Sequence, residues 1–308
     1  MENFEISEDV LCLKAVKFLK NEDFALFSGG DGSIQNPYRI SDGKQFSNIS
    51  KKPESSYLQI NDIHVSDFVK SFKGTYDGNG FLIKSLRIMH DFEEKSAMFI
   101  ENYGTIKRVI VSDGYIHGAK QSAGLVIDNY GTVELCAFSG EVAGADASGL
   151  CFTNHQNALI SQCLFTGRAT AQYCATGICG NNNGEILNVY SSANIMGMSS
   201  GGLVYNNYSL ISDSYFGGTA IGESAGIANT NSGRIKDSYS LDIIPVFSDY
   251  GATEGVEVRS DIQMKSSSGF AGLDFYVIWE INMTDGYGYP TLKNVLHQNI
   301  NHEQNTNE

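Results

Sequence analysis

A pair of aspartates has the spacing that glycan-cleaving chemistry would need. Asp213 and Asp237 lie 24 residues apart, in the matching segments Ile-Ser-Asp-Ser-Tyr and Ile-Lys-Asp-Ser-Tyr. Glycoside hydrolases place two carboxyl groups roughly 5–10 Å apart, a distance that equivalent residues of stacked repeats can meet. Asn188 takes the same place in the preceding repeat, and both Asp and Asn favour turns. We therefore favour a structural turn at this position and predict no catalytic residue.

Other patterns of catalysis and metal binding are missing from the sequence. The six histidines form no HExxH motif and no other spacing typical of zinc ligands. The chain also has no GxSxG, Walker or dinucleotide-binding glycine motif. Asp77 begins an Asp-Gly-Asn-Gly segment that lacks the further acidic positions of an EF-hand and is typical of a tight turn. The sequence predicts neither a cofactor nor a metal.

A column of aromatic residues is better suited to binding. One position of the repeat described below is occupied, in order, by Tyr103, Tyr130, His155, Asn183, Tyr208 and Ser232. Rings spaced about 5 Å apart could stack on sugar faces or form a row of protein contacts. We predict Tyr103, Tyr130, His155 and Tyr208 as binding residues. The alternative is that these rings cover the turn backbone and stack on one another.

Both the acid pair and the aromatic column belong to an internal repeat of about 25 residues, which must position them. From about residue 96 to 241 it recurs six times and begins with an apolar anchor: Met98, Leu125, Leu150, Ile178, Leu203 and Ile227. Four residues later there is always an asparagine: Asn102, Asn129, Asn154, Asn182, Asn207 and Asn231. An aliphatic residue returns as Ile106, Val133, Ile160, Ile186, Ile211 and Ile235, and residues 154–163 carry two extra positions. An aromatic follows in most repeats as Phe138, Phe165, Tyr190, Tyr215 and Tyr239.

The repeat predicts the fold. Short apolar runs bounded by Gly, Asn and Ser indicate strands, and the unit is too short for a propeller blade. In a solenoid, each asparagine amide can donate to the next side chain of its column and accept from the previous one. The expected fold is all-β, a right-handed parallel β-helix (β-solenoid) with small N- and C-terminal caps.

The cysteines follow the same register. Cys136 and Cys163 occupy equivalent positions in neighbouring repeats, as do Cys151 and Cys179, whereas Cys12 and Cys174 do not pair in this way. We interpret these cysteines as small buried hydrophobic residues. The sequence implies no disulfide framework.

The composition of the chain limits the kinds of molecule that it is expected to bind. The 308 residues are 42% hydrophobic, and 35 acidic against 21 basic residues give a net charge of −14. This charge repels phosphates and anionic lipids, so we expect no nucleic-acid partner. No stretch reaches the roughly 18 apolar residues of a membrane span, and the first twenty residues lack the features of a cleavable Sec signal.

Four segments are expected along the chain. Residues 1–28 form an N-terminal cap segment with a short helix over residues 7–20, since apolar residues there have helical spacing. The β-helix spans residues 29–259. Residues 260–297, which are rich in aromatic side chains, form a C-terminal cap, and the polar residues 298–308 form a disordered tail.

Several motifs resemble one family of bacterial surface proteins. They are the glycine-rich segment 29–41 with its Asn-Pro-Tyr-Arg-Ile, residues 72–80 (Phe-Lys-Gly-Thr-Tyr-Asp-Gly-Asn-Gly), the Asn-Tyr-Gly-Thr cores at 102–105 and 129–132, and the ending Trp279 with residues 288–292 (Gly-Tyr-Pro-Thr-Leu). Over roughly residues 28–293 the chain resembles proteins with GLUG-type repeats, which are right-handed β-helices near filamentous-haemagglutinin-like adhesins. The resemblance implies an adhesin, or the β-helix of a surface protease whose catalytic domain is separate. His155-Gln156-Asn157 departs from the family's Asn-Gly turn.

The favoured function is non-catalytic, adhesin-like recognition of a glycan or a surface protein through a lateral face of the β-helix. One alternative is a polysaccharide lyase or glycoside hydrolase. Another is an effector or toxin-associated protein exported without a Sec signal. We expect a secreted or surface-associated protein, with a cytoplasmic location left open, and no insertion into membranes.

Overall fold

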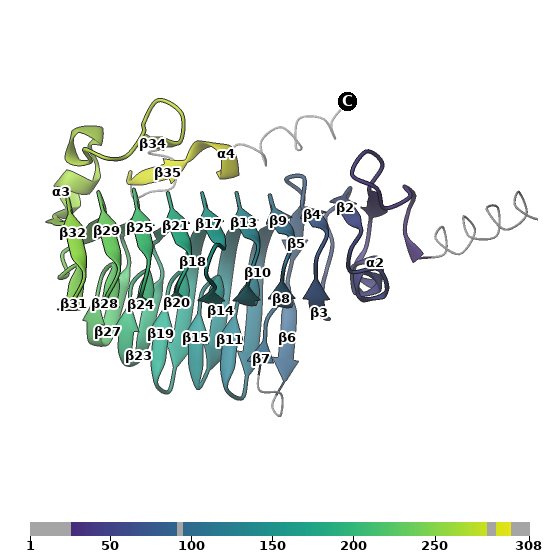
Figure 1. Ribbon diagram of the computed structural model, residues 1–308, viewed down its shortest axis with the longest axis horizontal. Helices are drawn as coiled ribbons and strands as arrows, with labels where there is room; N and C mark the ends of the chain where they lie inside the picture. Colours follow the sequence, from purple (N-terminus) through teal and green to yellow (C-terminus); the bar gives the residue numbers. More distant parts are fainter. Residues whose placement is uncertain (1–25, 91–94, 282–287, 297–308) are drawn as a thin grey trace, which may run out of the picture.

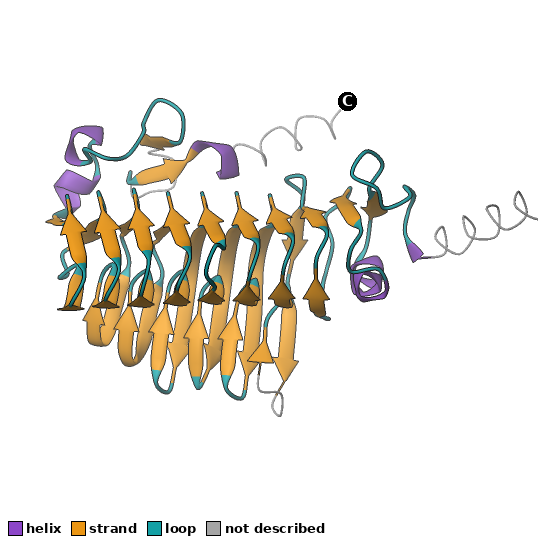
Figure 2. Cartoon of the chain, viewed as in Figure 1, coloured by secondary structure: helices purple, strands orange, loops and turns teal. Residues whose placement is uncertain are grey.

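The computed structural model describes residues 26–90, 95–281 and 288–296, and these residues build a rod of stacked coils (Figure 1). Three parallel sheets run along the rod, and every strand of a coil pairs with its equivalents in the neighbouring coils. The prediction of an all-β parallel β-helix is confirmed (Figure 2). The predicted helix over residues 7–20 and the predicted tail 298–308 lie outside the described residues.

The three sheets are named A, B and C, and within each coil the chain passes through them in the order C, A and B. Sheet C contains β3 (Val69–Phe72), β8 (Phe99–Asn102), β12 (Val126–Asn129), β16 (Cys151–Asn154), β20 (Cys179–Asn182), β24 (Val204–Asn207), β28 (Ala228–Asn231) and β31 (Val246–Asp249). Sheet A contains β1 (Tyr38–Ile40), β2 (Ser56–Gln59), β4 (Thr75–Asp77), β9 (Thr105–Lys107), β13 (Thr132–Glu134), β17 (Leu159–Ser161), β21 (Glu185–Leu187), β25 (Leu210–Ser212), β29 (Arg234–Lys236) and β32 (Ala252–Glu254).

Sheet B contains the most strands because most coils contribute more than one strand to it, for example β10 together with β11. It contains β5 (Leu82–Lys84), β6 (Arg87–His90), β7 (Lys95–Ser96), β10 (Ile110–Gly118), β11 (Gln121–Ala123), β14 (Ala137–Gly144), β15 (Asp146–Ser148), β18 (Leu164–Ala171), β19 (Cys174–Thr176), β22 (Tyr190–Ser191), β23 (Asn194–Gly201), β26 (Tyr215–Phe216), β27 (Thr219–Ala225), β30 (Tyr239–Leu241) and β33 (Glu257–Arg259).

The asparagine column is a continuous buried ladder, as the sequence predicts. Nδ2 of Asn102 donates to Oδ1 of Asn129 at 2.8 Å, and each later asparagine donates in the same way to the next at 2.8–2.9 Å. Asn231 ends the series by donating to Oδ1 of Asp249 at 2.8 Å. All six asparagines are fully buried, so the ladder satisfies polar groups that would otherwise be costly inside the rod.

Apolar columns fill the rest of the interior. The predicted aliphatic column from Ile106 to Ile235 is in register through sheet A and is buried along its whole length. Cys151 pairs with Cys179 across β16 and β20, and the cysteines among the described residues are free thiols. Burial raises the pKa of the Cys136 and Cys151 thiols.

The aromatic residues that follow the aliphatic column were predicted to share one position of the repeat. In the structure they occupy two neighbouring positions and form two separate columns. Tyr190, Tyr215 and Tyr239 align with Leu164 and project from the outer side of sheet B. Phe138 and Phe165 lie one residue further along their strands and therefore point into the core. A shift of one residue reverses the face of a strand on which a side chain lies.

A short helical segment covers the N-terminal end of the rod. It consists of α2 (Gly43–Ser47) and the 3₁₀ turn η1 (Asn48–Lys51), and Phe46 packs edge-on against Phe99 at 5.7 Å between ring centres. Asp42 caps α2 by accepting the Gln45 N–H at 2.8 Å. The sequence prediction placed residues 29–259 in the β-helix without this helix, although an Asp with Gln three residues later is a helix-start signal.

The C-terminal segment lies along the side of the rod (Figure 1). It contains α3 (Asp261–Met264), η2 (Ser267–Gly269), the antiparallel pair β34 (Trp279–Ile281) and β35 (Pro290–Leu292), and α4 (Lys293–Leu296). The indole of Trp279 is fully buried against Tyr190 and Tyr215, and its Nε1 donates to Oδ1 of Asn188 at 3.1 Å. The tyrosine column on the outer side of sheet B is therefore the surface on which this segment is held.

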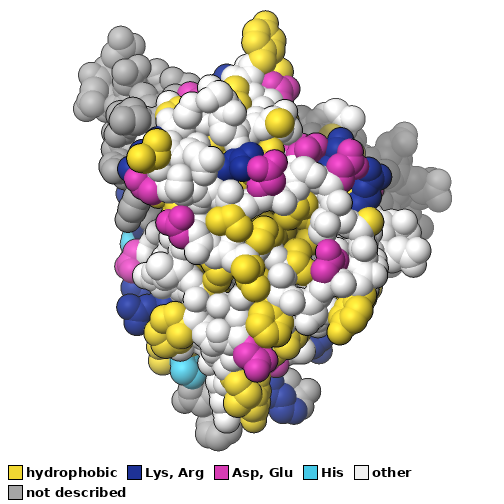
Figure 3. Space-filling model, turned by 90° about the vertical axis from the view of Figure 1, so that its left-hand side faces the viewer, with side chains coloured by type: hydrophobic (Ala, Val, Ile, Leu, Met, Phe, Trp, Pro, Cys, Tyr) yellow, Lys and Arg dark blue, Asp and Glu magenta, His cyan; other side chains and the backbone are white. Residues whose placement is uncertain are grey.

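The last coil is left open. Its strands β31, β32 and β33 are edge members of the three sheets, and their side chains are largely exposed. Figure 3 views this end of the rod and shows hydrophobic side chains across its middle. Phe247 and Val258, for example, are about half exposed. In the part of the chain that the structure describes, no helix is long and apolar enough to cross a membrane.

Candidate functional site

The predicted binding residues lie on the turns that join sheet C to sheet A. Each follows a ladder asparagine directly, and since the asparagine points inward, the next side chain points out. Tyr103, Tyr130 and Tyr208 are 47%, 42% and 53% exposed. The turn is tight: a Cβ added at Gly104 would lie 2.0 Å from the carbonyl oxygen of Gly74. A side chain at Gly104 would therefore clash with the preceding coil, whereas the equivalent position of the Tyr208 turn is occupied by Ser209.

Three of the four predicted residues form one stack. The rings of Tyr103 and Tyr130 are 4.7 Å apart between centres and inclined by 4°, and those of Tyr130 and His155 are 3.9 Å apart and inclined by 9°. Mutual stacking, the alternative left open by the sequence, is thus present in this part of the column. It covers the ring faces inside the stack, and the second face of His155 is turned toward a coil that carries Asn183 instead of an aromatic residue.

Tyr208 stands apart from the stack. The coil between His155 and Tyr208 presents the exposed Asn183 in this column, and the coil after Tyr208 presents Ser232. The column also has a member that sequence reasoning missed: Tyr250, 79% exposed, follows Asp249 in the last coil. The missed coil is short, because its ladder position follows Asn231 by only 18 positions, and it carries Asp in place of Asn.

His155 is held in place from two sides. Besides the stacking on Tyr130, its Nε2 lies 3.1 Å from Oδ1 of Asp128, and the other oxygen of Asp128 accepts from Nζ of Lys95 at 2.5 Å. The hydrogen bond to Asp128 raises the pKa of Lys95. The pKa of Tyr130 is raised by desolvation and then by the charge of Asp128. Neither Lys95 nor Asp128 was a predicted site residue, because their contacts join three different coils.

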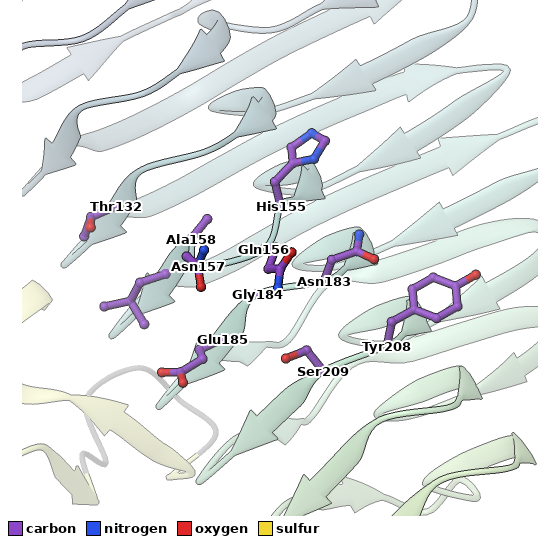
Figure 4. A pocket seen from close by; sticks show the side chains of 11 residues that line it. Thr132, His155, Gln156, Asn157, Ala158, Asn183, Gly184, Glu185, Tyr208 and Ser209 are labelled. Carbon is purple, nitrogen blue, oxygen red and sulfur yellow. The ribbon is translucent and has the colours of Figure 1, made fainter.

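A polar groove of about 1000 Å³ opens beside His155 (Figure 4). Its lining includes the side chains of Asn183, Glu185 and Tyr208 and the turn at residues 155–158. The two extra residues noted in the sequence make this turn longer than its neighbours, and it closes with a hydrogen bond from the Ala158 N–H to the His155 carbonyl at 3.0 Å. Figure 4 shows His155, Asn183 and Tyr208 projecting from successive turns.

The acid pair lies elsewhere, on the turns between sheets A and B. Asp213 and Asp237 have φ values of 54° and 42°, and Asn188 has 54°. This left-handed conformation suits Asp and Asn and agrees with the favoured turn role. A Cβ added at Gly272 would lie 3.0 Å from Oδ1 of Asp213, so the C-terminal segment lies directly on the pair. Burial, followed by the charge of Asp237, raises the pKa of Asp213.

Asp77 is the last residue of β4, and its side chain holds the tight turn that the sequence indicates. Its Oδ1 accepts the Asn79 N–H at 2.9 Å and the Nε–H of Arg108 at 2.8 Å. Over the described ranges, no group of three or more His, Cys, Asp or Glu side chains is arranged to hold a metal ion.

Comparison with known proteins supports the fold. No family model matches the chain, and no curated protein matches its sequence. A solved structure that is similar to it belongs to a Bacteroides ovatus protein described as a candidate immunoglobulin A1 protease. The TM-score is 0.58 at 17% sequence identity, and the match covers 87% of this chain and 96% of the other. At this identity, the likeness shows the β-solenoid fold alone.

Proposed function

We propose that this protein recognises glycans, without cleaving them, through the aromatic column on the turns between sheets C and A. The observation that carries the proposal is that His155, which stacks on Tyr130 by one face, and the half-exposed Tyr208 both line a polar groove. Ring faces and hydrogen-bonding groups together match the apolar faces and hydroxyl groups of sugars. In this proposal the protein acts as an adhesin, outside the cell or at a surface.

We also propose kinship with the GLUG-repeat and filamentous-haemagglutinin-like proteins. The support is that the shared motif residues have structural roles that a common fold would preserve. Asn102 extends the ladder and also accepts the Gly104 N–H at 3.0 Å. Motifs of this kind define the coil and leave the ligand to the residues between them.

An enzyme is the competing proposal. The similar Bacteroides ovatus protein is described as a candidate protease, and a lateral groove of a β-helix could also serve a polysaccharide lyase or glycoside hydrolase. The acid pair that would favour a glycosidase is partly covered by the C-terminal segment at Gly272, which restricts the approach of a substrate. This position favours binding over glycan cleavage.

The test is a broad glycan array on the purified chain, with each bound glycan examined by mass spectrometry after incubation. We expect binding without a change in glycan mass, and at least a tenfold weaker binding of the variant Tyr208→Ala. Tyr103→Ala and Tyr130→Ala should weaken binding less, because these rings support His155 from behind. The control Tyr276→Ala removes a ring that is 90% exposed on the C-terminal segment and should change nothing.

The other outcomes are equally clear. Cleavage of a bound glycan would replace the proposal with an enzyme. No binding on the array would remove glycan recognition and direct the search to a protein ligand of the same face.

A further inference from the structure

We propose that the break in the aromatic column at Asn183 is a slot for one uncharged pyranose residue, held between the rings of His155 and Tyr208. The inference rests on the proposed function and specifies its ligand. In an unbroken column each ring face is covered by the next ring, as Tyr103 is by Tyr130. At Asn183 one ring is missing from the series, and a ligand can take its place.

The spacing of the coils sets the thickness of this slot. Successive coils are about 4.8 Å apart, so the rings of His155 and Tyr208 stand two such steps from each other. The column already places ring centres 4.7 Å apart between Tyr103 and Tyr130. A six-membered ring inserted halfway would therefore lie at about the native stacking distance from both aromatic faces. The side chain of Asn183 is shorter than a tyrosine and leaves the outer part of this layer free.

The slot is formed before a ligand arrives. His155 is fixed by the stacking on Tyr130 at 3.9 Å and by the contact with Asp128 at 3.1 Å, so it cannot lean across the slot without losing both. Beneath the slot, the buried side chains of Asn154, Asn182 and Asn207 are hydrogen bonded to one another at 2.9 Å. A rigid site avoids much of the entropic cost of ordering side chains upon binding.

The residues that line the slot favour a polar ligand without a negative charge. The amide of Asn183 stands at the inner end of the slot and can both donate to and accept from hydroxyl or acetamido groups. Glu185 also lines the groove, whereas no Lys or Arg does, and the whole chain carries a charge of −14. A uronic or sialic acid would meet this negative charge without a cationic partner. The fitting ligand is therefore a neutral sugar.

The experiment tests the slot by replacing Asn183 with a tyrosine that would occupy it. Affinity for triacetylchitotriose, cellotriose and maltotriose is measured by calorimetry, with trigalacturonate as the acidic comparator. At least one neutral trisaccharide should bind, and trigalacturonate should bind at least tenfold more weakly. Asn183→Tyr should continue the stack, close the slot and reduce the affinity at least tenfold. The matched control Ser232→Tyr adds the same side chain to the same column two coils away, leaves the slot open and should preserve the affinity.

The outcomes separate the slot from the wider proposal. If Asn183→Tyr binds as well as the parent chain while Tyr208→Ala loses glycan binding, the slot is wrong and the glycan-binding face stands. If Ser232→Tyr loses as much affinity as Asn183→Tyr, the binding does not depend on this gap, and the slot is again wrong. If neither a neutral trisaccharide nor any glycan on the array binds, both proposals fail together.

Discussion

Nε2 of His155 lies 3.1 Å from Oδ1 of Asp128, which stands one coil earlier in the rod and 27 residues earlier in the sequence. The same carboxylate accepts from Lys95 at 2.5 Å, so residues of three coils meet at one side chain. The ring at the edge of the proposed slot is thus oriented by contacts between coils, and this arrangement can be tested separately from the slot itself.

Removing this support should weaken binding without unfolding the rod. Asp128→Ala frees the imidazole, and ordering one freed side chain costs about 0.5–1.5 kcal/mol upon binding, which corresponds to a two- to twelvefold loss of affinity. Calorimetry with the neutral trisaccharide that binds best measures the effect. Thr153→Ala changes the equivalent outward position of the next coil and should bind like the parent. Equal affinities of Asp128→Ala and the parent would show that Asp128 does not position the ring.

The asparagine ladder should carry a measurable share of the stability. Asn182→Ala leaves the amide of Asn154 without its side-chain acceptor and removes the donor to Asn207. Leaving a buried polar group without a partner costs about 1–3 kcal/mol. Asn183→Ala, at the exposed neighbouring position, should change the free energy of unfolding by less than about 0.5 kcal/mol. Urea denaturation followed by circular dichroism compares the two, and similar losses would argue against the ladder.

Asp213 should make the fold less stable at neutral pH than in mild acid. Burial and the charge of Asp237 raise its folded-state pKa above the ordinary value of 3.8, so the folded state holds the proton more tightly than the unfolded state. The destabilisation is complete above the folded-state pKa and disappears as the pH falls below about 3.8. Asp213→Asn should therefore stabilise the protein at pH 7, by less than about 1 kcal/mol for a partly solvated group.

Thermal unfolding across pH values measures this effect, and the advantage of Asp213→Asn should shrink toward zero in acid. Asn188 shows that asparagine is accepted in this turn conformation. Asp242→Asn makes the same change at an exposed residue with a φ of 51° and serves as the control. An advantage of Asp213→Asn that stays constant with pH would mean that its charge is not the cause.

The C-terminal segment should detach before the rod unfolds. Trp279 is the only tryptophan of the chain and is fully buried between this segment and the rod, so its fluorescence reports their contact. Tyr215→Phe removes a 2.6 Å hydrogen bond to the Pro290 carbonyl and should reduce the local stability of the segment by about 1 kcal/mol. The urea midpoint followed by fluorescence should therefore fall, while the midpoint followed by circular dichroism stays unchanged.

Tyr76→Phe is the reciprocal control, because it removes a 3.0 Å hydrogen bond to Gln59 inside the rod. It should lower the circular dichroism midpoint. Coincident transitions in both variants would indicate that the segment and the rod unfold as one unit.

The sequence was sufficient for the features that repeat. The asparagine and aliphatic columns could be predicted because stacking requires the same residue type at the same place in each coil. The two aromatic columns were treated as one, although Phe165 follows Ile160 by five residues and Tyr190 follows Ile186 by only four. The strand register shows that this difference of one residue places them on opposite faces of sheet B.

Features that depend on single tertiary contacts escaped prediction. The side of the rod on which the C-terminal segment lies is set by Trp279 meeting Tyr190 and Tyr215, and no periodic pattern encodes it. Of the candidate site, the sequence provided the ring positions. Which rings cover each other, and where a face stays bare, follows from Asn183 lying between His155 and Tyr208 in the stack.

The ladder that ends at Asp249 gives the rod a polarity. Every amide donates toward the C-terminal coil, from Asn102 to Asn231, so the side-chain dipoles align as peptide dipoles do in a helix, with the positive end last. A carboxylate stands at that end and accepts from Asn231, as an acidic residue does at a helix N-terminus. An ionised carboxylate accepts hydrogen bonds but donates none, so the series of amides that donate toward the C-terminal coil ends at Asp249.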